Sequence, residues 1–171
     1  MKKIFLLTFI ILLSNFSNAQ FFSKRKANKD TEKWRYEVVC MGEGKETNYT
    51  VKVFSFSKKP KVATEQAKKN AVHAIVFQGV NAGPCTSQDP LVRNPNAKDE
   101  KKEYWDAFFA DGGKYMKFVT ASNNGRVRPE DVSKISKREF KIGVIVSVDV
   151  EGLRQELEAS GILQNIGNIF K

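Results

Sequence analysis

The chain has 171 residues, one histidine, two cysteines and a formal net charge of +10. This length fits a single domain with a sizeable core, and one histidine with two distant cysteines supplies too few ligands for a zinc centre. The basic balance favours solubility and attraction to anionic partners, and because the lysines are scattered we expect most of them to form a solvated surface.

Residues 1–19 have the three parts of a secretory signal peptide: Lys2 and Lys3, an apolar run over 4–13, and small Ala19 at the predicted cleavage site. The apolar run is short for a membrane span, although an uncleaved anchor is the alternative. Cleavage lowers the net charge from +10 to +8, because it removes both lysines. The segment predicts export to the periplasm or the extracellular space.

The next segments are a leader and a hairpin. Residues 20–32 are charged and poor in apolar side chains, which predicts a flexible basic leader, either solvated or touching an anionic surface. Apolar and polar side chains then alternate over 34–40 and over 49–54, with glycines between them at Gly42 and Gly44. This pattern predicts two antiparallel strands.

An alanine-rich helix is predicted over 62–78, ending at Gly79. Small side chains at helical spacing would let this helix lie close against a sheet. His73 falls on the arc that also carries polar and charged residues, so we expect a surface histidine. A catalytic or metal-binding histidine is the alternative.

Residues 80–100 contain three prolines and few apolar residues, which predicts a long irregular loop. Long loops in compact domains often bind ligands, so this loop is where we expect function, unless it only wraps the sheet edge. In an exported protein, Cys40 and Cys85 predict one disulfide, and two separate buried thiols are the alternative.

Asp99 is predicted to cap an aromatic-rich helix over 100–110. Its rings are expected to pack into the core, with a stacking platform for sugars or bases as the alternative. Apolar and polar side chains alternate over 115–119, which predicts another strand. The polar sequence over 126–136 predicts a connection to the next strand.

The clearest pattern is the strand predicted over 140–150, whose β-branched residues alternate along one face. Gly143 suggests a bend or bulge in it. Asp149 is expected to cap a following helix that stops at Gly161. The apolar tail over 162–171 would dock on the domain or meet a partner.

No complete catalytic set is recognisable. A Ser-His-Asp or Cys-His arrangement would have to use His73, which has no carboxylate near it on its helix. Paired carboxylates converge only in space, and the candidates are Asp106, Asp111, Glu139 and Asp149. We therefore expect no enzyme, no cofactor, no metal and no catalytic residue.

Several stretches resemble a family of small secreted bacterial proteins without assigned function, and the likeness covers about residues 34–166. The stretches are KKNAVHA at 68–74, FQGV at 77–80, FFADGG at 108–113 and IGVIVSV at 142–148. More remotely, an alanine-rich helix after a hairpin and a closing strand–helix are similar to the N-terminal domain of flagellar assembly protein T and to related envelope lipoprotein domains. The resemblance implies an envelope-associated α+β interaction module.

The sequence thus predicts one α+β domain over 33–161, with an antiparallel sheet of about four strands, the alanine-rich helix and one or two further helices. The expected function is non-catalytic binding of an envelope protein. Binding of anionic glycan or peptidoglycan is the alternative, and a hydrolase using convergent carboxylates is the third hypothesis. No nucleic-acid partner is expected, and the oligomeric state is left open.

Overall fold

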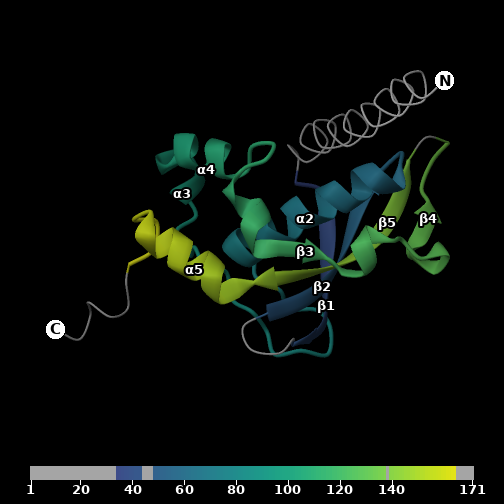
Figure 1. The fold of residues 1–171 in the computed structure, drawn as a ribbon, viewed down its shortest axis with the longest axis horizontal. Coiled ribbons are helices and arrows are strands. Elements are labelled where there is room, and N and C mark those ends of the chain that lie inside the picture. Colours follow the sequence, from purple (N-terminus) through teal and green to yellow (C-terminus); the bar gives the residue numbers. More distant parts are fainter. Residues whose placement is uncertain (1–33, 44–47, 138, 165–171) are drawn as a thin grey trace, which may run out of the picture.

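A computed structural model describes residues 34–43, 48–137 and 139–164. It has an antiparallel sheet with strand order β1-β2-β5-β3, and β4 also pairs with β5. Helix α2 lies across one face, while α3, α4 and α5 lie at the end of the molecule away from β4 (Figure 1). The bounds are β1 Tyr36–Glu43, β2 Asn48–Ser57, α2 Pro60–Phe77, α3 Ala97–Glu100, α4 Lys102–Phe108, β3 Val119–Ala121, β4 Val132–Lys134, β5 Phe140–Asp149 and α5 Val150–Ala159.

The α+β prediction is confirmed, with five strands rather than about four. The predicted signal peptide, the basic leader and most of the C-terminal tail lie outside the described residues. Within the described part, no helix is both long and apolar enough to cross a membrane.

Strands β1, β2 and β5 form the centre of the sheet, as their alternating patterns predicted. β2 pairs with β5 over its whole length, from Asn48 opposite Asp149 to Ser57 opposite Phe140. The register does not shift at Gly143, so the expected bulge there is wrong. Gly143 has another role: a Cβ at this position would lie 2.9 Å from the ring of Phe54 on the neighbouring strand.

The two helices predicted to pack on the sheet are confirmed. The alanines of α2 are fully buried and let its backbone lie close to β2 and β5. The Asp149 carboxylate accepts a hydrogen bond from the Gly152 amide at 2.9 Å, which caps α5 and places Leu153 and Leu157 in the core.

Three local predictions are wrong. Residues Lys114–Phe118 form a 3₁₀ turn instead of a strand, because β5 ends at Asp149 and leaves them no strand to pair with. Asp99 lies within α3 and caps neither α3 nor α4. The connection 126–136 contains the short strand β4, whose polar sequence gave no alternation signal.

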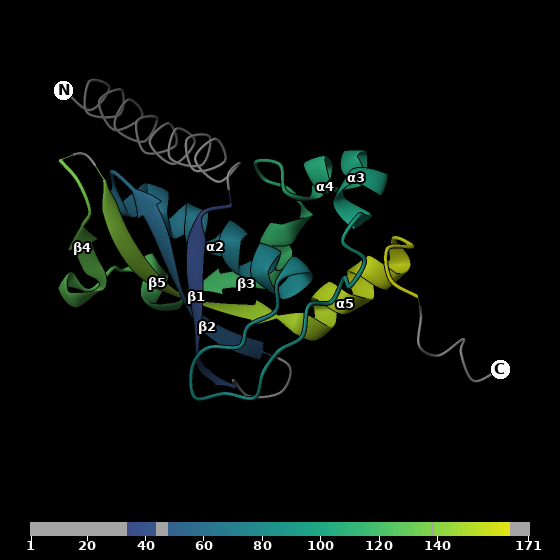
Figure 2. The same ribbon diagram turned by 180° about the vertical axis from the view of Figure 1, so that it is seen from behind.

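The predicted disulfide between Cys40 and Cys85 is present, with its Cα atoms 5.9 Å apart. It fixes the loop after α2 against the outer edge of β1, where the Cys40 amide donates to the Ala82 carbonyl at 2.7 Å. Gly83 permits this approach, since a Cβ there would lie 2.3 Å from the Cys40 carbonyl oxygen. Figure 2 shows the loop running past β1 and β2 to reach α3. The covered edge is protected from pairing with another chain.

Reducing the disulfide should lower the free energy of unfolding by about 4 kcal/mol, because it releases a cross-link between residues 45 positions apart. Urea unfolding of the oxidised and reduced wild-type protein tests this without changing a side chain. Equal midpoints, or free thiols at both cysteines in the purified protein, would contradict the cross-link.

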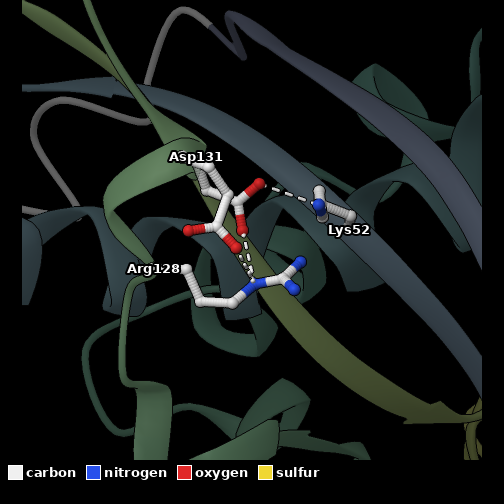
Figure 3. Close-up of polar contacts among 4 residues, drawn as sticks. Lys52, Arg128 and Asp131 are labelled. Atoms are coloured by element: carbon white, nitrogen blue, oxygen red, sulfur yellow. Dashed lines mark hydrogen bonds and ion pairs between the residues drawn. The ribbon is translucent and has the colours of Figure 1, made fainter.

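On the sheet face opposite α2, a polar network ties the β4 region to β2. Asp131 accepts hydrogen bonds from Lys52 at 2.8 Å and from Arg128 at 3.1 Å, one on each carboxylate oxygen (Figure 3). The Asp131 side chain is 9% exposed and that of Lys52 is 14% exposed. Burial by itself raises the pKa of Asp131, but the two hydrogen bonds outweigh burial and hold that pKa below its ordinary value.

The substitution Asp131→Asn should lower the free energy of unfolding by about 3 kcal/mol, because it leaves a largely buried ammonium without its carboxylate. Asp89→Asn is the control, since Asp89 pairs with Arg93 on the open surface and should change stability by less than about 1 kcal/mol. Equal losses in the two variants, measured by urea unfolding, would rule out a stabilising role for the network.

Candidate functional site

The candidate site is a cavity of about 500 Å³ where α2 meets α3, α4 and Trp34, which lies two residues before β1. Its walls carry partly exposed aromatic rings and buried or partly buried lysines. Its carboxylates belong to exposed residues. Its lining residues are Trp34, Lys69, His73, Phe77, Lys98, Asp99, Lys102, Trp105, Asp106, Phe109, Ala110 and Asp111.

Helix α2 supplies one wall through Lys69, His73 and Phe77, which are spaced four residues apart and share one face. Lys69 and His73 belong to the polar arc that the sequence placed in solvent. His73 is only 1% exposed and Lys69 only 7%, so the prediction of a surface histidine is wrong. The arc is buried because Tyr36, Trp34 and α3 cover it.

His73 is held from three sides. Its Nδ1 lies 2.6 Å from the Tyr36 hydroxyl oxygen, and its Nε2 lies 2.7 Å from Lys98 Nζ. Trp34 stacks on the imidazole with ring centroids 3.6 Å apart. A lysine ammonium can only donate, so Nε2 accepts from Lys98 and the ring proton is on Nδ1, which donates to the Tyr36 oxygen.

The surroundings keep His73 uncharged. Burial, followed by the charges of Lys98 and Lys69, lowers its pKa to about 2. Burial also raises the pKa of Tyr36 above its ordinary value. A neutral imidazole with such a low pKa is a poor proton acceptor near pH 7, so His73 is unsuited to act as a general base. Its hydrogen bond to Lys98 instead positions the Lys98 amine.

Lys98 is a partly exposed lysine of the cavity. Its Nζ lies 4.4 Å from the Phe77 ring centroid and 5.7 Å from that of Trp34. Among the described residues, no carboxylate oxygen lies within 4.0 Å of it. Burial lowers the pKa of Lys98, and the nearby charge of Asp99 opposes this effect in part.

The aromatic helix packs into the core as predicted, since Trp105, Phe108 and Phe109 are all buried. The Trp105 indole N–H donates to the Ala97 carbonyl at 3.0 Å and ties α4 to α3. The rings of Trp34 and Phe77 are more exposed, so they offer the cavity its accessible apolar surface.

Two of the four candidate carboxylates lie at the cavity, Asp106 and Asp111, and both belong to exposed residues. Asp106 is ion-paired with Lys102. Glu139 instead pairs with Arg35 at 3.3 Å, and Asp149 caps α5. Exposed, ion-paired carboxylates are typical of surface charge, whereas acid–base pairs of hydrolases depend on contrasting environments.

The segment 80–100, predicted to hold function, supplies two residues of the cavity, Lys98 and Asp99, and both lie in the short helix α3 at its end. In the described residues, no group of three His, Cys, Asp or Glu side chains could hold a metal ion. No protein-family model, curated protein or solved structure matches the chain.

The neutral His73 makes stability depend on pH. Its pKa is about 2 in the folded protein against an ordinary value of 6.5, so the unfolded chain binds a proton first as the pH falls. Stability is therefore full above pH 6.5 and declines below it. At pH 5 the loss should be about 2 kcal/mol.

Urea unfolding at several pH values between about 5 and 8 measures this slope, a range in which histidine is the side chain that ordinarily titrates. His73→Gln keeps a neutral polar side chain and should remove the slope, whatever its effect on overall stability. A slope that survives in this variant would show that another group is responsible.

Proposed function

We propose that this chain is an exported, non-catalytic binding protein whose cavity holds an acidic sugar unit of an anionic glycan or of peptidoglycan. The observation that carries the proposal is the position of Lys98 beside two partly exposed rings, Trp34 and Phe77. Its ammonium has no carboxylate partner among the described residues.

Each part of the cavity matches a part of such a ligand. A carboxylate on the sugar would accept a charge-assisted hydrogen bond from Lys98. The apolar face of the sugar ring would lie on the exposed ring surface of Trp34 or Phe77. The exposed carboxylates of Asp99 and Asp111 could accept hydrogen bonds from sugar hydroxyl groups.

The concave shape favours this role over the envelope-protein contact expected first from the sequence. Small-ligand sites are cavities of a few hundred Å³ with apolar walls and a few polar groups, and the cavity of about 500 Å³ fits that description. Export is supported by the signal-like residues 1–19 and by the disulfide, because disulfides persist in oxidising compartments.

Calorimetric titration with a glucuronate-containing oligosaccharide tests the proposal, with the matching neutral glucose oligosaccharide as the comparison ligand. The acidic ligand should bind more tightly than the neutral one. Lys98→Gln should weaken its binding about tenfold, because it removes one charge-assisted hydrogen bond.

Lys134→Gln is the matched control, since Lys134 is an exposed lysine on β4, away from the cavity. It removes the same charge and should leave the affinity unchanged. If both variants lost affinity for the acidic oligosaccharide equally, general electrostatic attraction would explain the binding. Absence of saturable binding would refute the proposed function.

A further inference from the structure

The three lysines of the cavity have different surroundings. Lys102 is on the outer rim and is ion-paired with Asp106. Lys69 is 7% exposed, which leaves its amine little room for an incoming molecule. Lys98 is partly exposed, and its amine faces the neutral Nε2 of His73.

These surroundings shift the pKa values of Lys102 and Lys98 in opposite directions. The hydrogen bond and charge of Asp106 raise the pKa of Lys102, whereas burial lowers the pKa of Lys98. A neutral imidazole stabilises an ammonium less than a carboxylate does. More of Lys98 is therefore in the free-amine form at a given pH, and the free amine is the nucleophilic form.

The ring contacts also position the Lys98 amine. The hydrogen bond to His73 fixes Nζ at one point, and His73 is itself fixed by Tyr36 and by the Trp34 stack. An amine that is held in place inside a ring-lined cavity meets a bound molecule in a restricted orientation, which favours reaction.

We propose that Lys98 in its free-amine form is a nucleophile that captures an aldehyde group, such as the open-chain reducing end of a sugar, as an imine. This inference rests on the binding role proposed above and adds a covalent step to it.

The step balances without a cofactor. Lys98 first gives one proton to water, and the nitrogen lone pair then attacks the carbonyl carbon to form a carbinolamine. A proton moves from nitrogen to oxygen, water leaves, and a carbon–nitrogen double bond remains. The products are one imine, one water and the proton that Lys98 first gave to the solvent, and the reaction reverses by hydrolysis.

The experiment uses the full exported chain with its disulfide intact and 4-carboxybenzaldehyde as the probe. Cyanoborohydride reduces any imine to a stable secondary amine, and peptide mapping by mass spectrometry locates it. Lys98 should be labelled at least about tenfold faster than Lys102, which lies on the same cavity and serves as the internal control. Excess benzoate should slow labelling of Lys98 and leave that of Lys102 unchanged.

Lys98→Arg keeps the positive charge but cannot form the imine, so it should abolish the fast labelling. Equal labelling rates at Lys98 and Lys102 would overturn the nucleophilic role. If the acidic oligosaccharide binds without selective labelling, the covalent step is wrong and the binding role stands. If Lys98 is labelled selectively but the oligosaccharide does not bind, the binding role fails and the reactive amine stands.

Discussion

The hydrogen bonding of one buried histidine is the constraint on which the candidate site depends. His73 is only 1% exposed, so both ring nitrogens need partners inside the protein. Tyr36 and Lys98 supply them, and in doing so they join β1, α2 and α3, which are far apart in the sequence. Trp34 covers the ring. The same contacts hold a partly buried amine beside exposed ring surface, so the packing of His73 also defines the chemistry of the cavity.

Much of the fold could be predicted from the sequence, because the spacing of apolar residues indicates which side chains share a face of a strand or helix. The strand over 140–150 and the alanine-rich helix over 62–78 are long and regular, and the structure confirms both. Predictions for shorter segments were wrong where contacts with another strand determine the local structure. Residues 115–119 alternate like a strand, yet only Val119 pairs with β5, and the residues before it form a 3₁₀ turn because β5 ends at Asp149. At Gly143 the absence of a side chain makes room for Phe54, which a single sequence does not reveal.

The candidate site was missed for a related reason. Periodicity placed Lys69, His73 and Phe77 on one face of α2, and spacing alone could have marked them as a stripe. What covers that face depends on contacts with Trp34 and Lys98, which lie 39 and 25 positions from His73 in the sequence. A polar arc on a helix usually faces water, and this one does not. The cysteine pair was predictable because the signal-like residues 1–19 predict export, and two cysteines in an exported chain usually form one disulfide.

The most direct measurement is the ring nitrogen spectrum of His73, recorded on protein labelled with ¹⁵N-histidine, since the chain contains no other histidine. The account predicts a protonated Nδ1 and an unprotonated Nε2 that stay unchanged between about pH 5 and pH 8. It also predicts that Lys98→Met perturbs the Nε2 resonance. A ring that titrates near its ordinary pKa, or one protonated on Nε2, would contradict the buried Tyr36–His73–Lys98 chain and with it the proposed cavity.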